Sequence, residues 1–184
     1  MKKILSIFSF ILTALFLTGC MALSPDPKLH EVLSHNDKPL IQSNVTVTAK
    51  MNDRLARQDT AIGVSDLVRE TIQVALKKAN IFDSNSQKYY KIHAQITKAS
   101  QAAFSMRRFP GKMEIEYTVS DNNGKTVFTK TVYNEGQSDV YYFAGAKRHT
   151  RSRIVTAAAN VNEFITAFEQ YLKSSQKSKK SVRK

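Results

Sequence analysis

Two runs of alternating apolar and polar residues, at 113–119 and 126–134, constrain the fold more than any other feature of the chain. The pair Asn123-Gly124 stands between them, and Asn-Gly between alternating runs is the strongest short-range signal for a β-hairpin. A two-residue turn at this pair sets apolar residues opposite each other on one face: Val119 opposite Phe128 and Ile115 opposite Val132. Because this register puts apolar side chains together on one face, it predicts two antiparallel strands with one buried side.

Three more segments have a clear period. Residues 90–97 alternate between apolar and polar side chains, and 40–50 contains valines that alternate with threonines, so both are predicted strands. Between them, apolar residues recur at helical spacing over 65–80. Ser65 is the expected N-cap of this helix, and Asp66 suits its first turn.

The cleanest pattern in the chain is an apolar stripe near its end. Its members recur at steps of three and four: Ile154, Ala157, Ala158, Val161, Ile165, Phe168 and Leu172. This spacing predicts a helix that packs across the sheet. The order β-α-β-β-β-α therefore predicts a single α+β domain over 41–172, with a mostly antiparallel sheet and two helices packed on one face.

The N-terminus has the pattern of an export signal. Two lysines precede an apolar stretch over 4–17, which is too short for a lasting membrane span. This stretch ends in Leu17-Thr18-Gly19-Cys20, which resembles the lipobox of bacterial lipoproteins: an aliphatic residue, two small residues and a cysteine. The resemblance implies that 1–19 is a cleaved signal peptide and that Cys20 carries a diacylglycerol and an N-acyl chain such as palmitate.

The resemblance also implies a location in the cell envelope. Two or three acyl chains anchor a protein stably, and Met21 stands where an aspartate would favour retention in the inner membrane. We therefore expect the periplasmic face of the outer membrane. Residues 20–40 contain three prolines and no period, so we expect a lipidated tether that spaces the domain from the membrane.

The composition excludes several classes of function. The chain has one cysteine, which the lipid would use, and four scattered histidines, so a disulfide, a cysteine-rich zinc site and a bound cofactor are not expected. No nucleophile motif or phosphate-binding glycine loop is present. Glu114 and Glu116 share the outer face of one strand, where carboxylates are usually solvated. We therefore expect that the protein is not an enzyme.

A basic cluster at the start of the last helix is the candidate anion-binding site. Its cations are Lys147, Arg148, Arg151 and Arg153, with Arg107 and Arg108 as possible neighbours. Cations at a helix N-terminus oppose the helix dipole, so a chain that keeps them there can be using them for phosphate or carboxylate. The aromatic run Val140-Tyr141-Tyr142-Phe143 could add apolar contact. The alternative is a solvated basic face.

The C-terminal tail, 173–184, holds six cations and no anion, so it is predicted to be disordered. Its cations could contact an anionic membrane or peptidoglycan, or only aid solubility. The final Arg183-Lys184 resembles the end of Braun's lipoprotein, which implies a possible covalent link of Lys184 to peptidoglycan. Nucleic acid is the usual partner of a chain with a net charge of +13, but export argues against it here.

The element order resembles that of small envelope lipoproteins of the YajG and lipopolysaccharide-assembly kinds. This resemblance implies a related fold and does not imply an activity. The leading expectation is a non-enzymatic accessory module that docks an envelope protein. We expect its signature to be an exposed sheet edge or an apolar patch around Tyr141 to Phe143. The alternative is a binder of lipopolysaccharide, phospholipid or peptidoglycan through the basic cluster.

Overall fold

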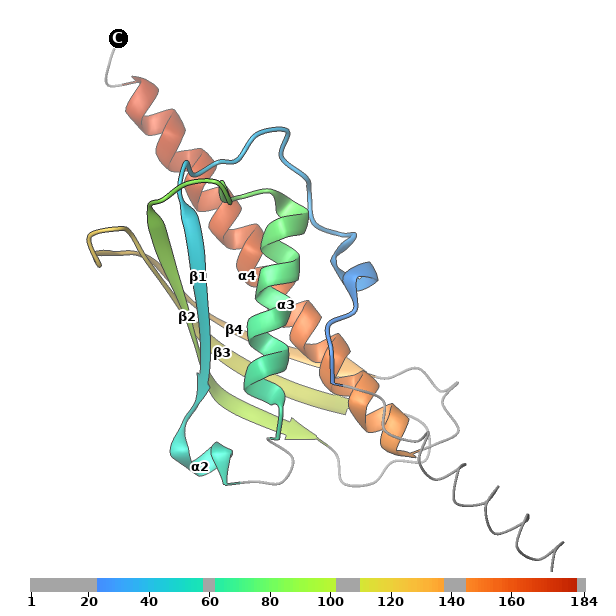
Figure 1. The fold of residues 1–184 in the computed structure, drawn as a ribbon. Coiled ribbons are helices and arrows are strands. Elements are labelled where there is room, and N and C mark those ends of the chain that lie inside the picture. Colours follow the sequence, from blue (N-terminus) through green and yellow to red (C-terminus); the bar gives the residue numbers. More distant parts are fainter. Residues whose placement is uncertain (1–22, 58–61, 102–109, 138–144, 182–184) are drawn as a thin grey trace, which may run out of the picture.

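The computed structural model describes residues 23–57, 62–101, 110–137 and 145–181. It has the predicted α+β architecture, with one four-stranded sheet and the long helices on one face (Figure 1). In chain order the elements are the 3-10 helix η1 (Pro27–His30), β1 (Asn44–Met51), α2 (Asp53–Ala56), α3 (Val64–Ala79), β2 (Tyr89–Gln101), β3 (Pro110–Ser120), β4 (Thr126–Gln137) and α4 (Gly145–Ser181). The sequence did not predict η1 and α2, because four residues are too few to show a period.

The sheet is mixed, with the strand order β1-β2-β3-β4. β1 and β2 are parallel because α3 joins them as a crossover, whereas β2, β3 and β4 are antiparallel neighbours. β1 and β4 are therefore the two edges of the sheet.

The β3–β4 hairpin has the predicted pairs, Ile115 with Val132 and Val119 with Phe128, but a longer turn than predicted. The Asp121 amide donates to the Lys125 carbonyl, and Gly124 has a φ of 78°. A register shift between Val119 and Ser120 compensates for the extra turn residue.

α3 begins one residue before the predicted start. Its N-cap is Gly63, with a φ of 75° and no side-chain cap, so Ser65 lies inside the helix instead of capping it. Asp66 lies in the first turn as expected, and the C-cap Asn80 has a left-handed conformation. The apolar face of α3 is buried, mostly against β1 and α4.

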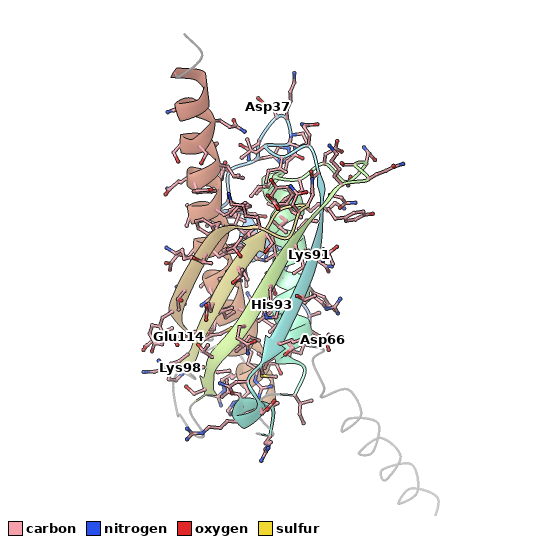
Figure 2. The ribbon with its side chains drawn as sticks, turned by 90° about the vertical axis from the view of Figure 1, so that its left-hand side faces the viewer. Asp37, Asp66, Lys91, His93, Lys98 and Glu114 are labelled. Atoms are coloured by element: carbon pink, nitrogen blue, oxygen red, sulfur yellow. The ribbon has the colours of Figure 1, made fainter. Side chains whose placement is uncertain are left out.

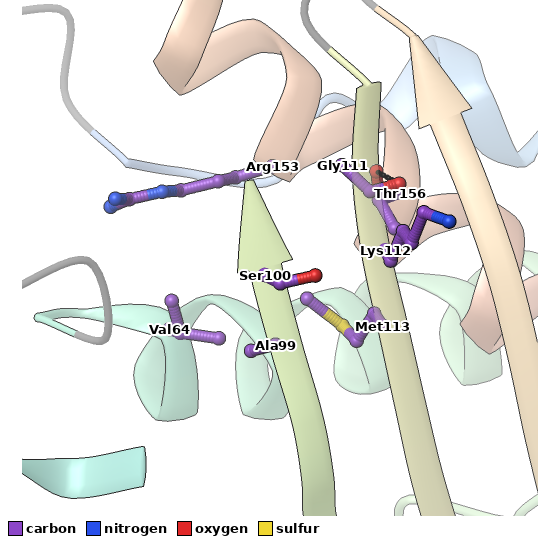
Figure 3. A pocket seen from close by; sticks show the side chains of 8 residues that line it. All are labelled: Val64, Ala99, Ser100, Gly111, Lys112, Met113, Arg153 and Thr156. Atoms are coloured by element: carbon purple, nitrogen blue, oxygen red, sulfur yellow. Dashed lines mark hydrogen bonds between the residues drawn. The ribbon is translucent and has the colours of Figure 1, made fainter. Parts of the chain in front are cut away.

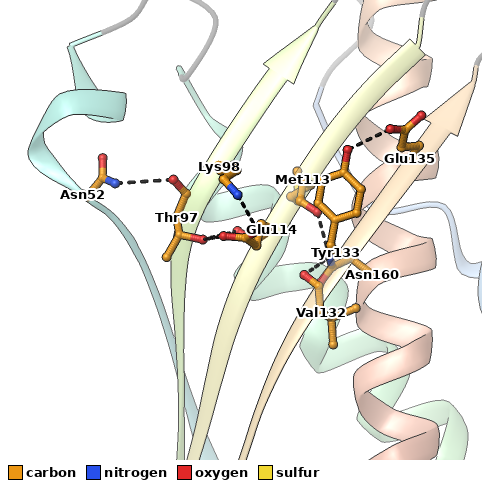
Figure 4. A network of polar contacts seen from close by, with 9 residues as sticks. All are labelled: Asn52, Thr97, Lys98, Met113, Glu114, Val132, Tyr133, Glu135 and Asn160. Carbon is orange, nitrogen blue, oxygen red and sulfur yellow. Dashed lines mark hydrogen bonds and ion pairs between the residues drawn. The ribbon is translucent and has the colours of Figure 1, made fainter.

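α4 lies across β3 and β4 at close range. Gly111 and Gly136 face each other in these strands, and a Cβ on Gly136 would lie 2.8 Å from the Thr156 Cα. The buried Asn160 amide donates to the carbonyls of Met113 and Val132, one on each strand (Figure 4). Small residues and one amide therefore fix where α4 crosses the sheet.

Aromatic rings fill the core beneath α4. Tyr117 stacks on Phe164 with ring centroids 4.0 Å apart, and its hydroxyl donates to the Asn160 Oδ1. Burial raises the pKa of Tyr117 well above its usual value. Phe168 lies further along the helix, stacked on Phe164.

α4 continues past Leu172, where the sequence predicted a disordered tail, and the described helix ends at Ser181. Two contacts hold its first extra turns: Lys173 pairs with Glu169, and the Gln176 side chain donates to the Leu40 carbonyl. Helix-forming residues and these anchors extend the helix where charge composition alone predicted none.

None of the helices in the described part of the chain is both long enough and apolar enough to cross a membrane.

Candidate functional site

The N-terminal segment, described from Leu23 onward, folds back onto the helices. The sequence predicted a tether over 20–40, and the described part of it, from Leu23 onward, lies along α3 and α4 (Figure 1). The Asp26 carboxylate accepts a hydrogen bond from the Arg151 guanidinium on α4, with an O–N distance of 2.5 Å. This bond is the main reason that the pKa of Asp26 is lowered.

A second contact fixes the same segment one turn further on. The His30 side chain is fully buried, and its Nδ1 lies 2.5 Å from the Asn162 Oδ1. Because the Asn162 Nδ2 donates to the Leu29 carbonyl, its Oδ1 must accept, so His30 Nδ1 carries the proton. The His30 Nε2 is buried and has no hydrogen-bond partner among the described residues.

Only three members of the predicted basic cluster have side chains among the described residues: Arg148, Arg151 and Arg153. Arg151 is committed to Asp26, and Arg148 and Arg153 also have interaction partners. Burial is the largest cause of a lowered pKa of His149, and it also lowers the pKa of Arg153. The remaining predicted members and the aromatic run lie outside the residues whose side chains are described: Lys147, Arg107, Arg108 and Val140 to Phe143.

Arg153 lines a small cavity between α4 and the ends of β2 and β3 (Figure 3). Its walls are Val64, Ala99, Ser100, Gly111, Lys112, Met113, Arg153 and Thr156. The cavity holds about 20 Å³, which is room for roughly one water molecule. It is too small for a lipid chain or a sugar ring.

The uncovered face of the sheet is polar, with side chains such as Lys91, His93, Lys98 and Glu114 (Figure 2). Glu114 binds Lys98 at 2.8 Å and accepts from the Thr97 hydroxyl, and both contacts lower its pKa (Figure 4). A carboxylate held in this way stays charged at neutral pH, so it is poorly suited to donate a proton.

Glu135 makes a similar arrangement at the β4 edge. It binds Lys112 at 2.9 Å, and this contact is the main reason that the pKa of Glu135 is lowered. It also accepts from the Tyr133 hydroxyl, which lowers the pKa further (Figure 4). Among the described residues no three metal-binding side chains gather at one point. Glu114 and Glu135, two carboxylates of this face, are therefore each held by a lysine.

A larger hollow lies between the edge strand β1 and α3. This groove, of about 480 Å³, is lined by Asn44, Val45, Val47, Gln73, Leu76, Lys77, Asn80, Phe82 and Ser84. Valine, leucine and phenylalanine side chains form its apolar part, and amide and ammonium groups from α3 form its rim. We call these residues the β1–α3 groove.

The backbone beside the groove is open along one edge. The amides of Asn44 and Asn52, at either end of β1, donate to carbonyls of β2 and its preceding residue. In a parallel ladder alternate residues bond to the same neighbour, so the even-numbered residues of β1 face β2. Val47 and Ala49 therefore direct their backbone N–H and C=O groups outward, and no described strand pairs with that edge.

The groove was not identified from the sequence, although an exposed sheet edge was expected. The sequence does show two of its apolar residues, Val45 and Val47, in a predicted strand. That this strand is an edge strand is seen only in the structure. Alternation predicted the strand but not its position in the sheet. The bond between Asp26 and Arg151 was also missed, because the two residues are far apart in sequence.

No family model matches the chain, and no curated protein is a significant match. Solved structures do share its fold. A Xanthomonas campestris protein of the DUF330 family is 13% identical with a TM-score of 0.50, over 78% of this chain and 94% of that chain.

Two further structures carry lipoprotein names. A Caulobacter crescentus protein provisionally named a lipoprotein is 16% identical with a TM-score of 0.49, over 71% of this chain and 91% of that chain. A minor lipoprotein from Acinetobacter baumannii is 9% identical with a TM-score of 0.41, over 75% and 96%. At these identities the likeness concerns the fold alone.

Proposed function

We propose that this protein is a lipoprotein of the bacterial envelope, on the periplasmic face of the outer membrane, whose domain docks a partner protein without catalysing a reaction. The lipobox at Cys20 supports the anchor. The observation that carries the docking role is the open edge of β1 directly beside the β1–α3 groove. The groove offers shape and apolar contact, and the edge offers unpaired backbone groups.

The anchor and the domain lie close together in this proposal. Only three peptide steps separate Cys20 from Leu23, a reach of about 10 Å when fully extended. From Asp26 onward the chain is held by Arg151 and Asn162. The end of the domain near Asp26 therefore sits next to the membrane. The groove, at the C-terminal end of α3 and the start of β1, is presented to proteins of the periplasm.

The occupant that fits both features is an extended segment of another protein. Such a segment can pair its backbone with the outward groups of Val47 and Ala49, as in β-strand addition. Alternate side chains of the added strand would then enter the groove over Leu76 and Phe82. A carboxylate on that segment would complement Lys77 at the rim.

An anion site at the basic cluster is the alternative function, and the structure gives it less support. Its Arg151 is bonded to Asp26 and is only 19% exposed, and the cavity beside Arg153 holds about 20 Å³. A phosphate group that bound Arg151 would have to displace the Asp26 carboxylate.

The test is site-specific photo-cross-linking in the bacterium that makes the protein. A photoreactive residue replaces Gln73 on the groove rim, and a matched control replaces Thr131, which is exposed on the outer face of β4. We expect one envelope protein to cross-link from Gln73 and not from Thr131. We also expect Ala49→Pro, which blocks an outward N–H, to abolish the cross-link.

Two outcomes would contradict the docking role. One is an equal pattern of cross-links from Gln73 and Thr131. The other is a Gln73 cross-link that Ala49→Pro leaves unchanged, because the partner would then not use the β1 edge.

A further inference from the structure

The short helix α2 lies at the same end of the domain as the start of α3, where the described chain begins (Figure 1). The Leu23 side chain is 3.1 Å from the position that a Cβ on Gly63 would take, and Gly63 is the N-cap of α3. Leu23 follows Cys20 by three residues, which reach about 10 Å when fully extended. A lipid on Cys20 would therefore hold this end of the domain close to the bilayer.

This end carries three cations and one exposed aliphatic side chain. Lys50 near the end of β1, Arg54 in α2 and Arg57 directly after α2 are exposed, and none of them makes an ion pair with a described residue. Ile62 stands directly before the Gly63 N-cap and is 74% exposed. We call Lys50, Arg54, Arg57 and Ile62 the α2 surface.

The carboxylates described beside the α2 surface leave it positively charged. Asp53 is the one acidic residue of α2, so a single negative charge stands among three positive ones. The Asp66 carboxylate, in the first turn of α3, is already bonded to Arg69 at 3.1 Å. The α2 surface therefore attracts an anionic partner.

Contacts with the sheet fix α2 in its place. The Asn52 amide donates to the Ile96 carbonyl of β2, and the Asn52 side chain accepts from the Leu55 amide. The Leu55 side chain packs against the hydrophobic core. Because Asn52 and Leu55 hold the helix from its inner side, the cations of Arg54 and Arg57 belong to a rigid part of the domain.

A bilayer with anionic headgroups matches both chemistries of the α2 surface. Lysine and arginine side chains are attracted to headgroup phosphates within a Debye length of about 10 Å. An aliphatic side chain can enter the boundary between headgroups and acyl chains. A protein partner would account for the charges, but it would not account for their position at the end of the domain that lies next to the anchor.

We infer that the α2 surface lies on the phospholipid bilayer that holds Cys20, with its three cations at headgroup phosphates and Ile62 in the interface. The inference rests on the proposed lipid anchor, because the anchor brings α2 to the bilayer. A second contact would stop the domain from turning freely about its lipid. The β1–α3 groove begins at Asn44, about 23 Å from the other end of β1, so this orientation points the groove away from the bilayer.

The test measures lipid contact at single positions of the full mature protein, purified from membranes and reconstituted in vesicles of phosphatidylethanolamine and phosphatidylglycerol. The mass of the N-terminal peptide first establishes whether Cys20 carries its lipid. Ile62→Cys then takes a thiol-reactive fluorophore, which a lipidated Cys20 does not. The matched control is Tyr89→Cys, since Tyr89 is 49% exposed and pairs with Asn44 at the opposite end of β1.

Lipids with a nitroxide near the headgroup quench a fluorophore that contacts the bilayer. We expect quenching at Ile62 to be at least about fivefold stronger than at Tyr89, because only the α2 surface reaches the interface. Quenching at Ile62 should also fall when salt is raised, or when phosphatidylcholine replaces phosphatidylglycerol.

A charge variant separates the α2 surface from the effect of the anchor alone. Lys50→Gln/Arg54→Gln/Arg57→Gln removes its three cations, and the matched control Lys88→Gln/Lys125→Gln/Lys177→Gln removes three exposed cations elsewhere. None of the six makes an ion pair with a described residue, so both variants should fold, which circular dichroism checks. From the quenching at Ile62, the first variant should lower the ratio of docked to free domains about tenfold or more, and the control less than about twofold.

Three outcomes would overturn the inference while the anchor stands. Equal quenching at Ile62 and Tyr89 would show a domain that turns freely about its lipid. Quenching at Ile62 that the charge variant leaves unchanged would show that the anchor alone produces the contact. Absence of quenching at Ile62 in the lipidated protein would leave the α2 surface to a protein partner. An N-terminal peptide without lipid would instead refute the anchor proposal, and the inference with it, so the two failures are distinguishable.

Discussion

Asp26 and Arg151 are bonded to each other at 2.5 Å, and this bond joins the segment behind the lipobox to the helix that crosses the sheet. The Asp26 side chain is 25% exposed and the Arg151 side chain 19%, so both are partly shielded from water. The pair explains why a segment rich in proline and polar residues does not extend freely from the domain. It also holds Asp26, six residues after the proposed lipidation site, near the start of α4.

The first prediction concerns this ion pair. Asp26→Asn should lower the free energy of unfolding at pH 7 by about 1–3 kcal/mol, because it removes a charge-assisted hydrogen bond and leaves Arg151 without that carboxylate. Chemical denaturation of the full chain followed by circular dichroism measures the change. Lys28→Gln, two residues away and exposed, is the control and should change stability little.

The pH dependence of the same pair gives an independent check. Arg151 lowers the pKa of Asp26 in the folded state below its usual 3.8. A lowered folded pKa means that the contribution is complete above pH 3.8 and is lost as the pH falls through the folded pKa. The stability difference between parent and Asp26→Asn should therefore be constant at neutral pH and shrink in acid. A difference that stays constant down to the lowest accessible pH would contradict the assignment.

The second prediction compares two glycines with different roles. Gly136→Ala would place a Cβ 2.8 Å from the Thr156 Cα, so α4 must move, and we expect a cost of about 2–4 kcal/mol. Gly124→Ala has open space around it but a φ of 78°, so it should cost only about 1 kcal/mol. Urea denaturation of both variants distinguishes them; equal costs would show that α4 does not approach β4 as described.

The third prediction concerns the buried amide of Asn160. Asn160→Leu removes its bonds to two strand carbonyls and leaves the Tyr117 hydroxyl buried without this acceptor, at a cost of about 2–3 kcal/mol. Adding Tyr117→Phe should recover part of that loss, because the orphaned hydroxyl is removed with it. Strictly additive losses in the double variant would mean that the two side chains are not coupled.

The fourth prediction tests the outward edge of β1. Lys50→Pro should destabilise the domain by about 1–3 kcal/mol, because the Lys50 amide faces β2 and proline removes a ladder bond. Ala49→Pro removes an amide that faces outward, so it should cost much less. Thermal unfolding of the two variants compares neighbouring positions in one strand. If Ala49→Pro cost more than Lys50→Pro, the odd-numbered residues of β1 would be the ones bonded to β2. The backbone groups of Val47 and Ala49 beside the β1–α3 groove would then not be open.

The sequence predicted the fold well wherever periodicity was strong. The apolar stripe from Ile154 to Leu172 and the hairpin pairs of β3 and β4 depend on local spacing, which a single chain displays directly. The N-cap of α3 was misplaced because Ser65 is a good cap in isolation, while the chain begins the helix behind a left-handed Gly63. The capping preference of a residue predicts the start of a helix only when no neighbouring residue takes a left-handed conformation, as Gly63 does here.

The candidate site was harder to predict because long-range contacts create it. The β1–α3 groove exists because β1 is an edge strand, which depends on how β2, β3 and β4 pair. The basic cluster was visible in the sequence, but its use of Asp26 was not, since the two partners are separated by most of the chain. The charge pattern of a sequence shows which charged side chains are present. It does not show which of them already form ion pairs inside the folded domain.

The central claim is that a lipid at Cys20 holds this domain at a membrane, and mass spectrometry of the protein from envelope fractions tests it most directly. The proposal predicts an N-terminal peptide that begins at Cys20 and carries a diacylglyceryl group and an acyl chain. It also predicts that Cys20→Ala moves the protein out of the membrane fraction. An unmodified Cys20 in a protein that still sediments with the membrane would contradict the account.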